Sequence, residues 1–594
     1  MRIRRTADAL GMRTVVPRTD GADALDLLDV GAVVAAATAA EADAVHPGFG
    51  FLAESPDFAE AVIAAGLAWV GPPPDAIRTM GDKGAARHLA TRLGIPVAAG
   101  YDGPDQSDAA LAAAASRIGL PLLVKPAGGG GGKGIHVVRS ADRLQDAIAT
   151  ARREAGAAFG DDRVILERFI EGPRHVEVQV LFDAFGSGVH LGERDCSIQR
   201  RHQKILEETP SPGLAAGLRD RLAGAALELG RAVGYVGAGT CEFLVDERDE
   251  PVFLEMNTRL QVEHPVTELV TGRDLVADQL RIAAGEPLGF SQADVSFEGH
   301  AVEVRLYAED AEAGFLPETG RVEAVRWPAG PGVRVDAGIE KGAEVSGRFD
   351  PMLAKVIARG HDRAEALERL AEALDETIVL GLITNLRFLR WLVRQPAVVD
   401  GLARVETLDR IWPPDDWAAR ALVPEEAWRV AAAALAVTAA APGDPWAGGW
   451  RLNGPATVRI EAEGEARGVA LTSGPASEPA PAVVVAGHTA HVDVGGRSVA
   501  FRIASPPDVD RAAGAAARHA TGATELVAPM PGAVVGVHAG VGDAVAAGAP
   551  VVTLEAMKME HAVTAPFDGR VAELRVDARD QVARGQVLAV VEPR

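Results

Sequence analysis

Cysteine is nearly absent from this sequence, which has only Cys196 and Cys241 among its 594 residues. Two cysteines cannot form a disulfide framework, and such low usage is typical of a reducing compartment. Long apolar runs are also lacking, because the alanine-rich stretches at residues 33–40 and 430–441 are too short to span a bilayer. No apolar stretch follows the basic start of the chain, so a signal peptide is not expected. We therefore expect a cytosolic protein that is not inserted in a membrane.

An excess of positive charge is lacking as well. The formal net charge is −23, from 60 Lys and Arg residues against 83 Asp and Glu residues. This balance disfavours a nucleic-acid partner or an anionic membrane partner. An anionic substrate would need a local basic pocket, so lysines and arginines that cluster inside motifs carry more weight. The 48% hydrophobic and 24% charged residues are ordinary for a globular protein.

The chain is too long for a single hydrophobic core, and about three to five domains are expected. Residues 1–80 alternate helical stretches with short apolar runs, which indicates an α/β arrangement. Further apolar runs predict strands at residues 120–124, 135–138, 175–182, 241–245, 252–256 and 491–494, and a helix at residues 363–379.

A small all-β domain is predicted at the carboxyl end. Residues 506–523 lack apolar periodicity and indicate a linker, which would span about 23 Å r.m.s. if flexible. Short strands with Pro and Gly turns follow from residue 524. Among them, Lys558 lies at a predicted tight turn between Met557 and Met559. A lone turn lysine is usually just solvated, but methionines avoid exposed turns, so we expect a lysine that a modifying enzyme recognises.

A glycine-rich loop lies between the predicted strands 120–124 and 135–138. Lys125 precedes the loop, and Gly130 and Gly131 lie within it. Glycines let the backbone approach phosphate oxygens and offer N–H donors without a side-chain clash. The loop is not a P-loop, because no helix-opening Gly-Lys-Ser/Thr follows it. A glycine run is more often a linker, but the flanking strands favour a hairpin lid over ATP.

Two acidic residues stand inside otherwise apolar predicted strands. Glu242 lies in one strand and Glu255 in the next, with Asn257 two residues later. One interpretation is an inward-facing charge held by a salt bridge. The other is a Mg²⁺ site, since desolvating several carboxylates together is costly without a cation. The phosphate-facing loop favours the metal site.

Dense charge alternation marks residues 193–204 and 255–265, and each segment alone could be a solvated surface loop. Together with residues 46–54, residues 80–83 and the glycine loop, however, they resemble the biotin carboxylases of the ATP-grasp superfamily. The resemblance covers residues 42–395. Ala-Met-Lys-Met around Lys558 resembles the attachment sequence of biotin carrier domains, and Ala-Pro-Met-Pro-Gly at residues 528–532 matches too. Lipoyl domains share that fold, but their lysine is typically flanked by an acidic residue.

The resemblance implies a role for each matching residue. The residues implied in nucleotide binding are Lys83, Lys125, Gly130, Gly131, Glu167, Ile170, His175, Gln199 and His202, with Glu167 and Ile170 at the adenine hinge. The residues implied in Mg²⁺ or Mn²⁺ binding are Glu242, Glu255 and Asn257. The residues implied in holding bicarbonate are Lys204, Arg259, Gln261 and the Val262 backbone. Glu263 is implied as the base that deprotonates bicarbonate, Arg305 as the cation that steadies the biotin enolate, and Lys558 as the biotin attachment site.

The implied fold is α/β: an ATP-grasp biotin carboxylase, a small β-barrel linker domain and a carboxyl-terminal all-β biotinyl domain. The implied domains are a truncated amino-terminal α/β domain at 1–81, the ATP-grasp domain at 82–285, the carboxylase carboxyl-terminal domain at 286–400, a subunit-docking helix and β-barrel-like domain at 401–505, the linker at 506–523 and the biotinyl domain at 524–594.

The implied activity is ATP-dependent carboxylation of a covalently bound biotin by bicarbonate. No carboxyltransferase segment is evident, so a separate carboxyltransferase β subunit and a hetero-oligomer are expected. Residues 444–452 resemble the docking region of acyl-CoA carboxylase α subunits, which favours a 3-methylcrotonyl-CoA-type or related short-chain acyl-CoA substrate. A biotin protein ligase would attach the biotin.

The sequence departs from the biotin carboxylases at its start. Their first strand and their Asn-Arg-Gly-Glu-Ile-Ala turn are missing, and roughly 25 further residues of the family pattern are missing near residues 16–28. A sheet without its first strand exposes an edge and apolar helix faces. This loss motivates one alternative function, an inactive subunit that serves only as a biotinylated partner. A different ATP-grasp ligase is a second alternative, which Lys558 and the Glu263 segment disfavour.

Overall fold

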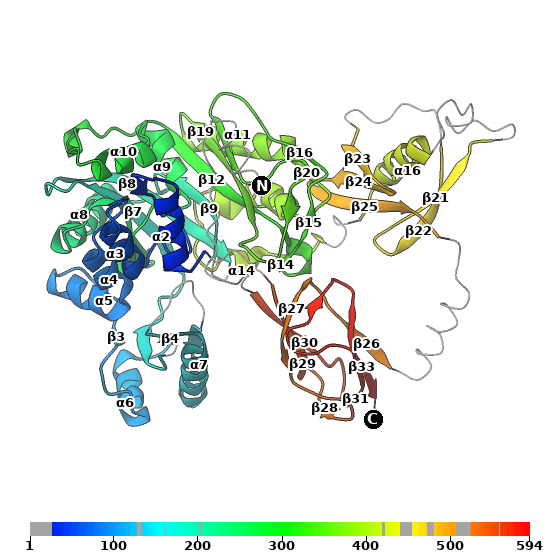
Figure 1. The fold of residues 1–594 in the computed structure, drawn as a ribbon, viewed down its shortest axis with the longest axis horizontal. Helices are drawn as coiled ribbons and strands as arrows, with labels where there is room; N and C mark the ends of the chain where they lie inside the picture. The colour runs from blue at the N-terminus through cyan, green and yellow to red at the C-terminus, as the bar shows by residue number, and fades with distance from the viewer. Residues whose placement is uncertain are drawn as a thin grey trace.

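The computed structural model describes residues 27–127, 134–159, 161–200, 203–417, 422–439, 454–471, 480–505, 523–556 and 559–593. Figure 1 shows a large α/β body from which a small lobe with β4 (Leu122–Pro126) and α7 (Leu144–Phe159) projects. A sheet with α16 (Glu425–Ala439) lies on the other side of the body, and the carboxyl-terminal strands gather beside β14 (Leu316–Pro317). No helix in these ranges is both long enough and apolar enough to cross a membrane.

The first described elements form a small α/β unit, as the sequence predicts. β1 (Ala44–Val45) pairs in parallel with β2 (Ala68–Trp69). The accompanying helices are α2 (Val30–Ala39), α3 (Pro56–Ala64), α4 (Pro74–Gly81) and α5 (Lys83–Arg92). The predicted loss near residues 16–28 falls almost wholly outside the described residues and stays a prediction.

The projecting lobe contains a four-stranded sheet in the order β3-β6-β4-β5. Its other elements are β3 (Gly100–Tyr101), α6 (Asp108–Ile118), β5 (His136–Val138), the 3₁₀ turn η1 (Ala141–Arg143) and β6 (Val164–Arg168). β4 and β5 pair with Leu122 opposite Val138. The two strands predicted beside the glycine loop are therefore confirmed, with bounds shifted by up to two residues. Gly130 and Gly131 lie outside the described residues.

The largest sheet has eight strands in the order β11-β10-β7-β8-β9-β12-β19-β17, and its neighbouring strands are antiparallel. The strands are β7 (Arg174–Phe182), β8 (Gly188–Arg200), β9 (Gln203–Thr209), β10 (Gly237–Val245), β11 (Pro251–Asn257), β12 (His300–Tyr307), β17 (Val333–Ala337) and β19 (Met352–Gly360). They confirm the strands predicted at 175–182, 241–245 and 252–256. β7 is buried along its whole length, so the charged residues in it face protein and not water.

Helices pack around this sheet. They are α8 (Ala216–Ala232), α9 (His264–Thr271), α10 (Leu275–Ala283) and α11 (Arg363–Glu376). The helix predicted at 363–379 is right in its start, where the Asp362 side chain accepts the Glu365 amide at 3.0 Å. Its end was wrong, because β20 (Ile378–Leu380) follows and pairs with β16 (Ala324–Arg326). The β-branched Ile378 and Val379 fit a paired strand better than a last helical turn.

Short elements complete the body. They are η2 (Gln292–Asp294), β13 (Glu309–Asp310), η3 (Ala311–Ala313), β15 (Gly320–Arg321), β18 (Glu344–Val345), α12 (Leu386–Leu392), α13 (Pro396–Val399) and α14 (Thr407–Ile411). β13 pairs with β14 and encloses η3 between them. Phe315 packs edge-to-face on Phe388 at 5.0 Å between ring centroids. This aromatic contact anchors Phe315, the residue before β14, in the core of the body.

The next domain is a five-stranded antiparallel sheet with α16 against it. The strand order is β22-β21-β25-β24-β23, with β21 (Thr457–Ala462), β22 (Glu465–Ala470), β23 (Val483–Ala486), β24 (Thr489–Val494) and β25 (Arg497–Ile503). Trp428 of α16 and Phe501 of β25 meet edge-to-face at 5.1 Å and form the centre of the core. β24 confirms the strand predicted at 491–494. The tryptophan-rich segment 444–452 lies outside the described residues.

The carboxyl-terminal domain consists of two four-stranded sheets, ordered β26-β33-β31-β28 and β30-β29-β27-β32. The strands are β26 (Thr524–Val527), β27 (Gly532–Val537), β28 (Ala544–Val545), β29 (Pro550–Ala556), β30 (Met559–Thr564), β31 (Gly569–Leu574), β32 (Gln581–Val582) and β33 (Val587–Pro593). The predicted all-β domain is confirmed. Lys558 falls between β29 and β30, outside the described residues, as does nearly all of the predicted linker.

Candidate active site

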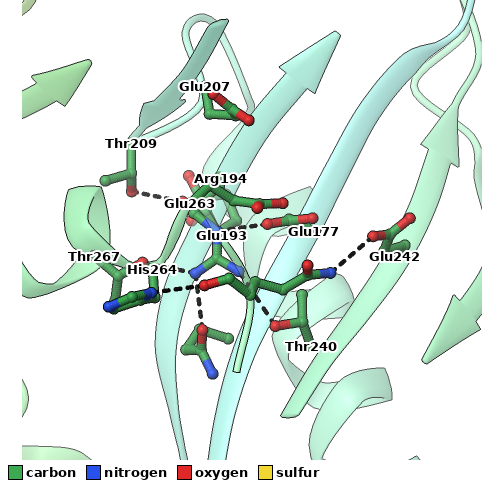
Figure 2. A network of polar contacts seen from close by, with 12 residues as sticks. Glu177, Glu193, Arg194, Glu207, Thr209, Thr240, Glu242, Glu263, His264 and Thr267 are labelled. Carbon is green, nitrogen blue, oxygen red and sulfur yellow. Dashed lines mark hydrogen bonds and ion pairs between the residues drawn. The ribbon is translucent and has the colours of Figure 1, made fainter. Parts of the chain in front are cut away.

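The candidate site lies on the large sheet, where neighbouring strands carry charged side chains at buried or partly buried positions. The buried residues are Glu177 on β7, Arg194 on β8, Glu207 on β9 and Glu242 on β10, and the partly buried ones are Lys204 on β9 and Arg305 on β12. Glu263 joins them from the residue before α9. Figure 2 shows Arg194 between the strands, with Glu177 and Glu263 close to it. Antiparallel pairing therefore brings together charges that are far apart in the sequence.

Glu263 is fully buried and contacts two cations. One carboxylate oxygen lies 2.7 Å from Lys204 Nζ, and the other lies 2.9 Å from a guanidinium nitrogen of Arg305. Burial alone would raise the pKa of Glu263, but Lys204, Arg305 and Arg194 hold that pKa well below its ordinary range. The carboxylate is therefore ionised at neutral pH and is fixed between its two partners.

Lys204 contacts three carboxylates at once. Its Nζ lies 2.5 Å from Glu177, 2.9 Å from Glu242 and 2.7 Å from Glu263. Burial would lower the pKa of Lys204, but the three carboxylates raise it well above its ordinary value. The lysine therefore remains a cation inside the protein. Lys204 thus contacts both the predicted base, Glu263, and a predicted metal ligand, Glu242.

Arg259 and Gln261 lie on the loop between β11 and α9. Arg259 Nε donates to Glu54 at 2.9 Å, and a second guanidinium nitrogen donates to the Gln261 side-chain oxygen at 3.0 Å. Gln261 donates in turn to Glu242 at 3.1 Å. The Val262 carbonyl accepts from Lys355 Nζ at 2.6 Å. The residues expected to hold bicarbonate are thus tied to the rim of the site that contains Glu263.

Arg305 joins Glu263 to a second buried acid. Its Nε donates to Glu207 at 2.6 Å. Burial raises the pKa of Glu207 to about 7, although Arg305 opposes the increase and Glu263 adds to it. Glu207 thus shares the Arg305 guanidinium with the predicted base. The sequence did not single out Glu207, since an acidic residue near a strand end is a common surface feature.

The predicted metal ligands lie on two paired strands. Glu242 on β10 and Glu255 on β11 are register partners, and the Asn257 amide donates to Glu242 at 2.8 Å. His175 lies 2.9 Å from Glu242. Burial and the charge of Glu242 raise the pKa of Glu255. Two adjacent carboxylates with an amide oxygen form a hard-oxygen donor set that suits Mg²⁺, and a cation would relieve their repulsion.

Lys83 and Lys125 approach the site from the amino-terminal unit and the small lobe. Lys83 opens α5, and burial together with the charge of Lys125 lowers the pKa of Lys83, while Glu255 opposes this. Lys125 on β4 forms a salt bridge with Glu167 on β6, and Arg87 pairs with the same carboxylate. The Glu167 side chain is thus taken up by two cations. Its contact with adenine stays a prediction.

The structure also locates the remaining predicted residues. The side-chain amide of Gln199, on β8, lies 3.2 Å from Nδ1 of His175, on β7, so the two residues are neighbours on adjacent strands. Ile170 is half-buried just after β6, at the base of the small lobe. His202, Gly130, Gly131 and Lys558 lie outside the described residues, and their roles stay predictions.

Arg194 is a central residue of the site that sequence reasoning missed. It is fully buried and donates to Glu177 at 2.5 Å, Gln179 at 2.9 Å and Thr267 at 2.9 Å (Figure 2). It therefore ties β7 to α9 and positions the helix that begins next to Glu263. Its place in the alternating Glu-Arg-Asp segment was the available signal, but alternation alone does not show that both faces of β8 are buried.

The chain matches four protein-family descriptions in succession. Residues 12–77 match the biotin carboxylase N-terminal domain, and residues 82–291 match the ATP-binding domain of the carbamoyl-phosphate synthase L chain. Residues 303–410 match the biotin carboxylase C-terminal domain, and residues 524–591 match the biotin-requiring enzymes. The charged site lies where the second and third matches share the large sheet.

Curated relatives cover between 60% and 93% of the chain. It is 38% identical to the mitochondrial methylcrotonoyl-CoA carboxylase subunit alpha of Dictyostelium discoideum, over 93% of this chain and 85% of that relative. It is 50% identical to the biotin carboxylase of Haemophilus influenzae, over 60% of this chain and 80% of that relative. The match to the methylcrotonoyl-CoA carboxylase subunit alpha of Glycine max spans 69% of this chain but 58% of that relative, at 45% identity.

Solved structures agree with these matches. The biotin carboxylase domain of Hydrogenobacter thermophilus 2-oxoglutarate carboxylase is 37% identical and aligns with a TM-score of 0.66, over 69% of this chain and 94% of that one. The biotin carboxylase of Campylobacter jejuni aligns with a TM-score of 0.64 at 38% identity, over 69% of this chain and 96% of that one. The chain therefore belongs to the family of biotin-dependent acyl-CoA carboxylase alpha subunits, which join a biotin carboxylase to a biotinyl domain.

Proposed function

We propose that this protein uses ATP and bicarbonate to carboxylate a biotin bound to its own Lys558. A separate carboxyltransferase β subunit then transfers the carboxyl group to an acyl-CoA, of the 3-methylcrotonyl-CoA type. The observation that supports the first step most strongly is the ionised Glu263, which is fixed between Lys204 and Arg305. The relatives named as methylcrotonoyl-CoA carboxylase subunits support the choice of acyl-CoA.

Glu263 is the proposed general base. Bicarbonate is a weak nucleophile until it loses its second proton, and a positioned carboxylate can accept that proton. In the free protein, Lys204 and Arg305 keep the pKa of Glu263 low, because they outweigh the effect of burial. A bound bicarbonate would share these two cations with Glu263. The negative charge of Glu263 would then be less stabilised and its pKa would be higher. Glu263 would thus become a better proton acceptor once bicarbonate is bound.

Cationic and amide donors around the base would hold the anion. Arg259, Gln261 and Lys204 converge near Glu242 through hydrogen bonds of 2.9 to 3.1 Å. The negative charge that accumulates as bicarbonate attacks the terminal phosphate of ATP needs such fixed partners. At 4 Å and an effective dielectric constant of 20, each charge pair contributes about 4 kcal/mol.

Glu242, Glu255 and Asn257 are the proposed ligands of Mg²⁺ or Mn²⁺, which supplies charge neutralisation for the ATP phosphates when bound. Lys83 and Lys125 would contact the same phosphates from the other side. Lys83 lies close enough to Glu255 for the two charges to affect each other. The small lobe with the glycine loop would close over the nucleotide and exclude water.

The other assignments are proposals of the same kind. The resident biotin would supply the nitrogen atom that receives the carboxyl group, and a biotin protein ligase would attach it. We propose the domain division at 1–81, 82–285, 286–400, 401–505, 506–523 and 524–594, with the 401–505 domain docking the β subunit. A cytosolic location also stays a proposal, since several relatives carry a mitochondrial designation.

The inactive-subunit alternative gains no support. It rests on the shortened amino-terminal region, whereas Lys204 pairs with both Glu242 and Glu263, and Arg305 pairs with Glu263, at 2.7 to 2.9 Å. A different ATP-grasp ligase is disfavoured by the biotin-requiring match at residues 524–591.

Two linked measurements test the proposal. ADP release by the purified protein should require both bicarbonate and biotin, and intact-mass analysis should show one biotin. The Lys558→Arg variant should lose the biotin mass and capture on avidin resin but should retain ATP turnover with free biotin. ADP release that is indifferent to bicarbonate would contradict the assignment. Avidin pulldown of the unmodified protein should recover a carboxyltransferase chain, whose acyl-CoA preference is then measured.

A further inference from the structure

A docking contact joins the carboxyl-terminal β domain to the carboxylase body. Arg584, in the turn between β32 and β33, forms a salt bridge with Glu318, just after β14, and lies 3.5 Å from Asp310 of β13. Leu316 of β14 belongs to the same apolar cluster as Leu526 and Met530 of the β domain. Figure 1 shows this domain next to β14 and separate from the sheet around α16.

The end of the β domain that contacts the body is the end at which β29 stops, two residues before Lys558 in the sequence. Gly585, next to Arg584, donates to the Ala528 carbonyl at 2.8 Å. Gly532, four residues after Ala528, pairs with Val582. A Cβ at Gly532 would lie 3.3 Å from Ala556, which ends β29 two residues before the lysine. The arginine turn and the end of the biotin hairpin are therefore neighbours on one end of the domain.

The receiving surface is continuous with the active site. β12 carries Arg305, and Asp310 follows it by only five residues, which extended chain limits to about 16 Å. The Asp310 side chain also accepts the backbone amides of Glu312 and Ala313, which fixes the η3 turn. The docking surface is thus a rigid extension of the strand that carries a proposed catalytic cation.

The charges at this contact are complementary, but the net contact is weak. The Glu318 and Asp310 side chains are only 10% and 4% exposed, whereas Arg584 is 43% exposed. Two buried carboxylates require a cation nearby. Arg497 of β25 lies 3.9 Å from Asp310, and Arg584 of the β domain adds a second cation that also pairs with Glu318. A half-exposed arginine gives a weak net contact, so the domain can also leave. The domain and the body belong to one chain, which keeps the effective concentration of the domain near the body on the order of millimolar.

We propose that the turn formed by Asp310, Leu316 and Glu318 is the docking surface that presents the tethered biotin to the carboxylase site. Arg584 is a positioning residue in this contact, because it orients the lysine-bearing end and does not touch the reacting atoms. The delivery part of the inference rests on the proposed function, but the contact itself does not.

Cross-linking tests the contact without any enzyme assay. Arg584→Cys combined with Glu318→Cys should form a disulfide in the native full-length protein, detected by intact mass and thiol titration. Cys196 and Cys241 are buried and should not compete. The control pair is Arg575→Cys with Glu318→Cys, because Arg575 pairs with Glu573 within the β domain. We expect the Arg584 pair to oxidise at least about tenfold faster, and equal rates would overturn docking.

Charge reversal tests delivery. The measured quantity is the ratio of two rates, carboxylation of the tethered biotin and carboxylation of free biotin by the same protein. Arg584→Glu should lower this ratio about tenfold, because it repels Glu318 and Asp310. Combining it with Glu318→Arg should restore most of the ratio, which a merely structural role would not do. An unchanged ratio in Arg584→Glu would overturn the delivery role. Failure of the unmodified protein with both forms of biotin would overturn the proposed function, while the cysteine pair still decides docking.

Discussion

At the residue scale, the main feature is a chain of alternating charges buried in a sheet. Lys204 and Arg305 both bind Glu263, and each also binds a second acid, Glu177 or Glu207. A buried carboxylate with no partner would be protonated, so these pairs keep the base ionised.

Glu263→Gln removes the proton acceptor and keeps the shape of the side chain. We expect kcat for bicarbonate-dependent ADP release to fall by about 10² to 10³. Steady-state rates with free biotin measure this effect. Glu309→Gln, another buried acid of the same body, serves as the control and should retain activity. A loss of less than tenfold in Glu263→Gln would show that another group accepts the proton.

Glu303 is a buried acid outside the proposed chemistry. Within the described part of the chain, neither of its carboxylate oxygens has a hydrogen-bond partner. Burial raises the pKa of Glu303 to about 8 from an ordinary 4.5, against the opposing charge of Lys355. Between pH 4.5 and about 8, the folded protein therefore keeps a proton on Glu303 that the unfolded chain has lost. The free energy of unfolding falls as pH rises through this range.

Glu303→Gln should remove this dependence. The free energy of unfolding of the variant, minus that of the unmodified protein, should increase as pH rises from about 4.5 to about 8. The increase should be at most about 1.4 kcal/mol per pH unit and should stop above this range. Thermal unfolding across this pH range measures the difference. Glu286→Gln, at an exposed position, is the control. An advantage that is constant with pH would mean that Glu303 is already ionised in the folded protein.

At the element scale, local signals set where helices begin, and pairing sets where they end. Asp362 caps α11 through the Glu365 amide, a signal that is visible in the sequence. The end of the helix was mispredicted because β16, more than 50 residues earlier, recruits Ile378 and Val379 into β20. Sequence windows contain the first kind of information and not the second.

Asp362→Ala should destabilise the protein by about 1 kcal/mol, since the first turn of α11 loses its side-chain acceptor. Chemical denaturation monitored by circular dichroism measures the change. Asp400→Ala, at an exposed position after α13, provides the comparison and should change stability far less. An equal effect in both variants would show that the cap is not what stabilises α11.

At the scale of the whole molecule, the tethered domain and the carboxylase body meet at one acidic turn. If the contact is made within one chain, carboxylation of the tethered biotin is a unimolecular step. Its rate constant should then stay the same over a wide range of protein concentration. Single-turnover measurements at several dilutions check this. A rate that rises in proportion to concentration would mean that the domain is delivered to a different copy of the protein.

The sequence by itself indicated the family, through its resemblance to biotin carboxylases and biotin carrier domains, and the order of the matching segments. It also named Glu263, Lys204, Arg305 and Glu242 as candidate site residues, because the motifs that carry the resemblance contain them. In the large sheet, β8, β9, β12, β17 and β19 were not predicted, whereas apolar runs predicted β7, β10 and β11. The motifs and the apolar runs depend on neighbours a few residues away.

Only the tertiary structure decided which charges neutralise one another. Glu207 and Lys355 lie on strands that pair with the distant β12, and Arg194 donates to Thr267 of the distant α9, so nothing local showed that these residues are buried together. The contact of Arg584 with Glu318 likewise joins positions 266 residues apart. The physical reason is that an ion pair depends on distance and desolvation in the folded protein, and both are set by strand register and domain packing.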